Sequence, residues 1–156
     1  MSSRVMIETL PDIECACATV RRAARLVTQL YDEEFAGRLE ASQFALLSAL
    51  EQQPGCNQST LARALGLDKT TLSRNLSVLA GKGWIERQTS TDQRERGVRL
   101  TPAGRELLKT VSSAWRRAQT RLRSAMTTEQ WDQMWEAVRI LTNASQQALN
   151  KGANAL

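Results

Sequence analysis

Three cysteines are the side chains best suited to covalent or metal chemistry, because the sequence contains no histidine. Cys15 and Cys17 are separated by one residue near the N-terminus, and Cys56 follows a Pro-Gly pair. An all-thiolate zinc site needs four cysteines, commonly paired two to four residues apart. One chain cannot supply such a site, so we expect no bound metal and no cofactor. An all-thiolate zinc site could form only between two chains, with two thiolates from each.

Cys17 is also a candidate for thiol redox chemistry. Arg21 follows one helical turn later, and a neighbouring cation favours the thiolate, which is the reactive form of cysteine. Cys17 also lies on the apolar stripe of a predicted helix, where a cysteine commonly serves as a small buried side chain. Three roles therefore stay open: an inert Cys17, a redox or electrophile sensor at Cys17 or Cys15, and capture of a metal or metalloid. We assign no role to Cys56.

The lack of histidine weighs against hydrolases and transferases, because histidine is the commonest general base and the usual partner of a nucleophilic serine. No glycine-rich phosphate loop and no grouped carboxylates support these classes either. Of the 21 basic residues, 17 are arginines, whose planar guanidinium suits phosphates and guanine edges. This composition favours a polyanionic partner.

The net charge of +5 is concentrated in the middle of the chain. Residues 57–105 hold nine bases and four acids, which is the whole excess, whereas the remaining residues hold twelve of each. Such a distribution is typical of one module that docks on nucleic acid. No apolar run approaches the roughly 18 residues that cross a bilayer, and the first residues lack a secretory signal. We therefore expect a cytoplasmic protein that does not bind membrane.

Hydrophobic periodicity predicts a mainly α-helical chain with one small β-hairpin. The first helix is expected to start at Pro11-Asp12 and to stop at Gly37. Thr127 and Gln130 resemble a capping box that opens the last helix, and residues 150–156 are expected to form a frayed tail. The expected elements are helices over 12–37, 41–53, 57–66 and 68–81, strands over 84–88 and 97–100, a long helix from Thr101-Pro102, and a last helix from Thr127.

The middle of the chain combines a short helix, a tight turn at Gly66-Leu67 and a second helix capped by Asp68. The inner face of the second helix carries leucines four and three residues apart, namely Leu72, Leu76 and Leu79. Its outer face carries Thr70, Ser73, Arg74 and Ser77. A charged hairpin with a polar tip over 89–96 follows. This order is that of a winged helix-turn-helix, whose second helix enters the major groove while the hairpin reaches along the backbone.

The sequence resembles the MarR family of bacterial transcription regulators over nearly its whole length. A long run of short motifs in a fixed order carries the resemblance. These are Leu39, Gln43, Phe44 and Leu47, Leu61-Ala62, Leu65-Gly66-Leu67-Asp68-Lys69, Thr70-Thr71-Leu72-Ser73-Arg74-Asn75-Leu76, Leu79, Lys82-Gly83, Ile85-Glu86-Arg87, Asp92-Gln93-Arg94 and Leu100-Thr101-Pro102-Ala103-Gly104-Arg105.

The resemblance implies one domain over residues 1–156 that forms a homodimer through its N- and C-terminal helices. The winged helix-turn-helix would span 39–105, and residues 12–37 and 106–150 would form the dimerisation helices. Trp115, Trp131 and Trp135 agree with a dimer, because these large side chains need an apolar surface to cover them. The expected partner is an inverted-repeat operator in double-stranded DNA, and the expected action is repression.

The chemistry of the outer face divides the expected DNA contacts into two kinds. Thr70, Ser73 and Arg74 have the reach and polarity for base edges, and Arg74 suits a bidentate contact to guanine. Lys69 and Ser77 suit phosphates. By the resemblance, Arg94 of the wing inserts into the minor groove, while Asp92 holds the wing tip by pairing with an arginine. The expected DNA-binding set is Lys69, Thr70, Ser73, Arg74, Ser77, Arg94 and Arg96.

The resemblance also implies a small aromatic or phenolic effector, bound between the dimer helices and the winged domain. Arg25, Tyr31 and Gln43 are polar residues near that expected cleft, and packing or solvation is an equal alternative for them. Cys17 matches the reactive cysteine of the organic-hydroperoxide-sensing branch, which pairs it with tyrosines, whereas this chain has a single tyrosine. An architectural DNA-binding protein without an effector is the alternative function.

Overall fold

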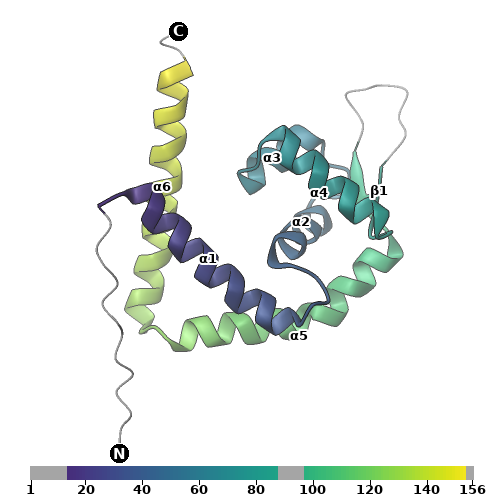
Figure 1. Cartoon of the computed structure of the whole chain (residues 1–156), viewed down its shortest axis with the longest axis horizontal. Coiled ribbons are helices and arrows are strands. Elements are labelled where there is room, and N and C mark those ends of the chain that lie inside the picture. The colour runs from purple at the N-terminus through teal and green to yellow at the C-terminus, as the bar shows by residue number, and fades with distance from the viewer. Residues whose placement is uncertain (1–13, 88–96, 154–156) are drawn as a thin grey trace, which may run out of the picture. The chain divides into compact units, whose positions relative to one another are not determined.

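The computed structural model describes residues 14–87 and 97–153, and these residues form a mainly α-helical chain with one β-hairpin (Figure 1). The predicted fold class is confirmed. The chain forms two compact units, Met1–Ser112 and Ser113–Leu156, and the first contains the whole predicted DNA-binding module. The elements are α1 (Ala16–Phe35), α2 (Ala41–Gln52), α3 (Gln58–Leu65), α4 (Lys69–Gly81), β1 (Ile85–Arg87), β2 (Val98–Leu100), α5 (Pro102–Ser124) and α6 (Thr128–Ala153).

The helix α1 begins later than the sequence predicts and ends close to where it predicts. The sequence predicts a helix from Asp12, but residues 14 and 15 are not helical, because Cys15 is the N-cap and has extended backbone angles. Asp12 itself lies outside the described residues. The chain leaves the helix through Ala36 and Gly37, whose φ angles are 50° and 74°. Glycine adopts this left-handed region without a Cβ penalty, which explains the stop.

A hydrogen bond fastens the end of α1 to the start of α2. The Ala41 N–H donates to Asp32 Oδ1 at 2.6 Å, so a carboxylate of α1 lies at the positive end of α2. Aromatic rings support this contact, because the centroid of Phe35 lies 5.1 Å from that of Phe44 and 6.4 Å from that of Tyr31. Phe35 is fully buried.

Local capping sets the boundaries of the helix-turn-helix formed by α3 and α4. Asn57 accepts a hydrogen bond from the Thr60 N–H and Asp68 accepts one from the Thr71 N–H, each at 2.9 Å. Gly66 between the two helices has a φ of 63°, where glycine is favoured. Both predicted helices are therefore confirmed.

The core of the first unit lies where α2, α4 and the hairpin face one another. Its leucines come mainly from α2 and α4, and each strand adds one β-branched side chain. The buried side chains of these elements are Leu46, Leu47, Leu50, Leu72, Leu76, Leu79, Ile85, Val98 and Leu100.

The hairpin is a two-stranded antiparallel sheet that is tied to the loop before α3. The Cα partners are Ile85 with Leu100, Glu86 with Arg99 and Arg87 with Val98. In the middle pair, Arg99 Nε donates to Glu86 Oε1 at 2.7 Å. The Gly55 N–H donates to the Val98 carbonyl at 3.3 Å, which links the loop to β2. Both predicted strands are confirmed, but each begins one residue later than predicted, after Trp84 and Gly97. Gln88 lies outside the described residues.

A close approach between Trp84 and Gly104 joins the hairpin to α5. The Thr101 N–H donates to the Trp84 carbonyl at 3.0 Å. The Thr101 hydroxyl donates to the Gly83 carbonyl at 2.6 Å and accepts the Gly104 N–H at 3.1 Å, which caps α5 at the predicted position. A Cβ on Gly104 would collide with the Trp84 carbonyl oxygen, so only glycine fits there.

The second unit contains the C-terminal part of α5 and the helix α6. The predicted capping box is confirmed: the Thr127 N–H donates to Gln130 Oε1 at 2.9 Å, and the Gln130 N–H donates to Thr127 Oγ1 at 3.1 Å. Arg123 donates to Thr128 Oγ1 at 2.8 Å and lies 5.6 Å from the centroid of the Trp131 ring. These contacts fix the turn that starts α6.

The helix α6 continues to Ala153, so the prediction of a frayed tail is wrong for residues 150–153. Residues 154–156 lie outside the described part.

Exposed apolar side chains gather on the two terminal helices. They are Val20, Leu26 and Val27 on α1, and Trp135, Val138, Ile140, Leu141 and Leu149 on α6, while Val78 on α4 is exposed apart from them. In the described residues, no helix is long and apolar enough to span a membrane.

Replacement of Gly104 by alanine is expected to lower the free energy of unfolding by roughly 1 to 3 kcal/mol, because the new methyl group overpacks the Trp84 backbone. Urea unfolding followed by circular dichroism measures the change. Ala103→Gly is the matched control, since it exchanges the same two residue types at the neighbouring exposed position. Equal stability of Gly104→Ala and the wild type would contradict the close approach.

Candidate DNA-binding interface

The outward face of α4 is exposed, and it is polar apart from Val78 near its C-terminal end. The three leucines at spacings of four and three residues are buried, which turns the opposite side of the helix to solvent. All five residues that the sequence assigns to DNA contact on this helix are exposed, namely Lys69, Thr70, Ser73, Arg74 and Ser77. The structure therefore brings these residues together on one exposed helix.

Hydrogen bonds within α4 occupy some of these side chains and leave others available. Ser77 Oγ donates to the Ser73 carbonyl at 2.9 Å, so its hydroxyl hydrogen is already used. Thr71 Oγ1 donates to Asp68 Oδ2 at 2.6 Å. Arg74 has no acidic partner within ion-pair distance among the described residues. Its guanidinium is thus the strongest unengaged donor group on this face.

Asp68 holds the first turn of α4 in place as a carboxylate. The hydrogen bond from the Thr71 hydroxyl lowers the pKa of Asp68 below its usual value, and the Thr71 N–H adds to the effect. A lowered pKa means that the folded helix favours the ionised form. The N-terminus of α4 is therefore stabilised by a charge at neutral pH.

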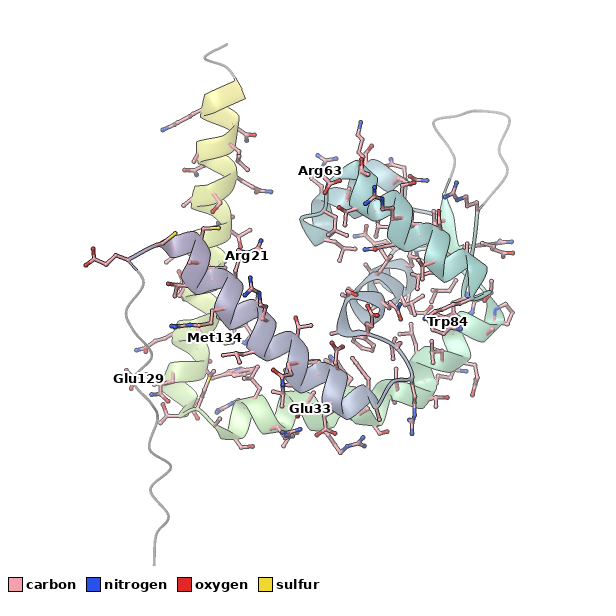
Figure 2. The ribbon with its side chains drawn as sticks, viewed as in Figure 1. Arg21, Glu33, Arg63, Trp84, Glu129 and Met134 are labelled. Atoms are coloured by element: carbon pink, nitrogen blue, oxygen red, sulfur yellow. The ribbon has the colours of Figure 1, made fainter. Side chains whose placement is uncertain are left out.

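Arg63 belongs to the basic surface of this module, although the site assignment from the sequence omitted it. It is exposed in the last turn of α3, the helix before the recognition helix (Figure 2). The first helix of a helix-turn-helix crosses the DNA backbone, where an arginine suits a phosphate. The local excess of bases over residues 57–105 is the signal that could have identified it.

The wing is described only at its base. Asp92, Arg94 and Arg96 lie outside the described residues, so their roles stay predictions. At the base, Arg99 is engaged by Glu86, and both side chains are about half exposed. Arg87 at the end of β1 is exposed.

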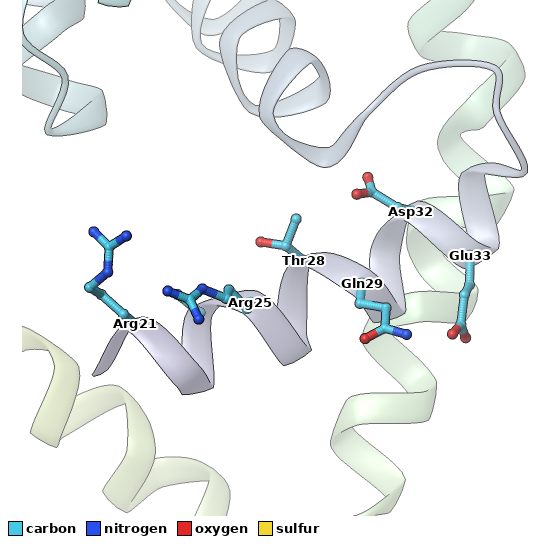
Figure 3. A pocket seen from close by; sticks show the side chains of 7 residues that line it. Arg21, Arg25, Thr28, Gln29, Asp32 and Glu33 are labelled. Carbon is cyan, nitrogen blue, oxygen red and sulfur yellow. The ribbon is translucent and has the colours of Figure 1, made fainter. Parts of the chain in front are cut away.

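A shallow, open recess of about 560 Å³ lies along α1 (Figure 3). Arg21 and Arg25 stand one turn apart in it and make no ion pair with any described residue. In the close view, both arginines and Thr28 project from the same side of the helix as Asp32. The lining residues are Arg21, Ala24, Arg25, Thr28, Gln29, Asp32 and Glu33.

The three residues expected in one ligand cleft lie in different places. Arg25 lines the α1 recess, whereas Gln43 lines a smaller pocket of about 160 Å³ between α2 and α4. Tyr31 lines neither of these pockets; it packs against Phe35, and burial raises the pKa of its hydroxyl. Their role in ligand binding stays a prediction.

The cysteines lie in two different environments. Cys15 and Cys17 are exposed at the start of α1, so Cys17 is not buried within the single chain. Cys56 is half-buried between α2 and α3, and burial raises the pKa of its thiol, which keeps it protonated. In the part of the chain that the structure describes, no group of three or more cysteine, aspartate or glutamate side chains could hold a metal ion.

Comparison with known proteins points to one family. The model of the MarR family matches residues 39–95, which include α2, the helix-turn-helix and β1. The crystal structure of the M. tuberculosis transcriptional regulator MosR in complex with DNA is 31% identical, covers 86% of this chain and 98% of its own, and gives a TM-score of 0.78. The S. aureus MepR–DNA complex, 24% identical over 83% of this chain and 98% of MepR with a TM-score of 0.72, shows the same fold.

A curated relative agrees with these structures. The transcriptional repressor MprA of Escherichia coli (strain K12) is 33% identical over 112 residues, which are 70% of this chain and 64% of MprA. The chain spans 43% to 64% of the length of the first curated relatives that it matches.

Acid is expected to weaken the start of the recognition helix. Because the folded state lowers the pKa of Asp68, its stabilising effect is complete at neutral pH and is lost as the pH falls through that lowered pKa. The variant Asp68→Asn keeps an N-cap that does not titrate. Melting temperatures measured from neutral to acidic pH should therefore fall more steeply for the wild type than for Asp68→Asn, and parallel curves would contradict the assignment.

Proposed function

Because this chain belongs to the MarR family of transcription regulators, as its sequence predicts, we propose that it binds an inverted-repeat operator in double-stranded DNA as a homodimer and represses transcription. The observation that carries the proposal is the exposed polar face of α4 with Arg74 on it. MosR, which is bound to DNA in its structure, and the repressor MprA support it. The proposed location is the cytoplasm, where bacterial DNA lies.

The side chains of α4 suit the major groove in both shape and chemistry. An α-helix fits the width of that groove, and an arginine can donate two hydrogen bonds to guanine O6 and N7. Thr70 and Ser73 lie on the same exposed side as Arg74 and carry short polar groups. Lys69 at the N-terminus of the helix and Arg63 on α3 supply charge for phosphates. Arg94 and Arg96 are proposed to add wing contacts.

The terminal helices supply an argument for the dimer. In the single chain, Val20 and Val27 of α1 and Trp135, Val138 and Leu141 of α6 are exposed, although each is large and apolar. Soluble monomers rarely leave contiguous apolar faces open to water. A second copy that covers these faces would give a two-fold dimer, and two recognition helices would then read two inverted half-sites.

We propose that the α1 recess receives the effector, a small aromatic or phenolic acid. Arg21 and Arg25 offer two guanidinium groups one turn apart, and neither has a described acidic partner. A carboxylate or phenolate can accept charge-assisted hydrogen bonds from such a pair. Arg25 is therefore the residue expected to anchor the acid, while Tyr31 and Gln43 are proposed to influence binding from the neighbouring α1–α2 contact.

A thiol switch is the second candidate signal, because Cys17 is exposed and Arg21 lies one turn away. A hydroperoxide would react with the Cys17 thiolate at its O–O bond, giving a sulfenic acid on Cys17 and releasing an alcohol after proton uptake. Cys17 shares the exposed apolar side of α1 with Val20, so the added oxygen would lie in the proposed dimer contact. Cys15 is the neighbouring thiol available for further oxidation.

Replacement of Arg74 by alanine is expected to weaken binding to the operator by roughly 1 to 3 kcal/mol, because a bidentate base contact is lost. The measurement is a titration at fixed salt on the DNA upstream of the protein's own coding sequence, with a random duplex in parallel. Arg94→Ala tests the wing in the same way. Arg139→Ala on α6 is the control, because Arg139 already pairs with Glu136 on a terminal helix.

The random duplex separates a specific regulator from an architectural DNA-binding protein. A regulator binds its operator about 10³-fold or more tightly than random DNA, whereas affinity that rests on counterion release alone is similar for both. Equal binding of Arg74→Ala and the wild type to the operator would contradict the assignment of α4.

Release of the DNA complex should depend on different residues for the two candidate signals. In a titration with phenolic acids, Arg25→Met is expected to need roughly tenfold more acid than the wild type, because it loses a charge-assisted hydrogen bond. With a mild hydroperoxide, the wild type should release DNA and Cys17→Ser should not. Each variant is the control for the other signal. If Arg25→Met responds to acid like the wild type, the recess is not the effector site; if Cys17→Ser responds to hydroperoxide, the thiol switch is excluded.

A further inference from the structure

Lys82 touches two different elements from the end of the recognition helix. It is the C-cap of α4, and its Nζ donates to Gln43 Oε1 of α2 at 3.4 Å. The same Nζ lies 4.5 Å from the centroid of the Trp84 ring, at the start of the hairpin (Figure 2). One ammonium group therefore contacts both α2 and the base of the wing.

Both partners of Lys82 are themselves held in place. Gln43 Oε1 also accepts the Glu40 N–H at 3.1 Å, which forms the capping box of α2. The Trp84 carbonyl accepts the Thr101 N–H at 3.0 Å and lies against Gly104. Lys82 thus joins the end of α4 to two anchored groups, one at the start of α2 and one at the hairpin–α5 junction.

We propose that Lys82 is a positioning residue for DNA reading, which holds the C-terminal end of α4 to α2 through Gln43 and to the wing base through Trp84. This inference rests on the proposed DNA-binding function. The cap at Asp68 fixes the N-terminal end of α4, and Lys82 fixes its other end. Base recognition needs side chains held to well under 1 Å, so a helix released at one end loses specific contacts before nonspecific ones.

The alternative role for an exposed lysine beside a recognition helix is a direct phosphate contact, and the two roles differ in salt dependence. Removal of one phosphate contact lowers the slope of log Kobs against log salt by about 0.9, whereas removal of a positioning contact leaves the slope unchanged. Because the Lys82 ammonium already contacts the Gln43 amide oxygen and the Trp84 ring, we expect an unchanged salt slope.

The test compares Lys82→Met, Gln43→Met and the double variant for binding to the operator at several salt concentrations. Lys82→Met keeps the aliphatic stem and loses the charge, and Gln43→Met removes the acceptor without changing the charge. We expect each single variant to bind the operator roughly three- to tenfold more weakly with an unchanged salt slope, and the double variant to be no weaker than the weaker single one. Gln43→Glu should bind the operator more tightly than Gln43→Met, because its carboxylate keeps an acceptor for Lys82.

The control is Lys109→Met on α5, which removes one exposed lysine that pairs with Glu106. It should leave affinity unchanged. A slope reduced by about 0.9 in Lys82→Met, or additive effects of the two single variants, would overturn the proposal. Unchanged affinity in Lys82→Met would overturn it as well.

Amide hydrogen exchange without DNA keeps the test independent of the proposed function. Lys82→Met and Gln43→Met should both exchange faster than the wild type in the last turn of α4 and at Trp84, and they should retain wild-type rates in α3. If the wild type does not prefer the operator, the proposed function fails, and the exchange rates alone decide whether Lys82 fastens α4. Unchanged exchange in both variants would overturn the link.

Discussion

The burial of three leucines along α4 decides which side chains this protein can offer to DNA. Leu72, Leu76 and Leu79 are buried, and burying a leucine contributes about 1.5 to 3 kcal/mol. Because the three occupy one side of the helix, Arg74 must lie on the other. Rotating α4 to present another face would expose all three leucines, which costs more than the roughly 1 to 3 kcal/mol that one good base contact returns. The core therefore sets the face of α4 that is proposed to read DNA.

Short-range contacts then fasten this helix to its surroundings. Asp68 caps its first turn, and Lys82 joins its last turn to α2 and to Trp84. Close packing of Gly104 against the Trp84 carbonyl continues the connection into α5. Since α5 carries on into the second unit, the proposed DNA-binding module and the proposed dimer helices share one element. A change in the terminal helices can therefore reach the proposed DNA-binding module through α5.

Features governed by neighbouring residues could be predicted from the sequence, and those governed by distant residues could not. The cap at Asp68 and the capping box of Thr127 depend on residues three apart, so they were predicted correctly. The contact between Lys82 and Gln43 joins residues 39 positions apart and has no local pattern. For the same reason, Arg25 and Gln43 were assigned to one cleft although they line different pockets. The start of α1 was misplaced because Pro11-Asp12 is a strong local signal that the chain does not follow at residues 14 and 15.

Two-fold binding is the central claim, and a hydroxyl-radical footprint of the protein on the DNA upstream of its own gene tests it most directly. Two recognition helices in a symmetric dimer should protect two patches related by a two-fold axis, with half-site centres about 10 base pairs or a multiple of that distance apart. Arg74→Ala should weaken both patches equally, because each belongs to one copy of the same helix. A single protected patch, or protection spread evenly along the duplex, would contradict the account.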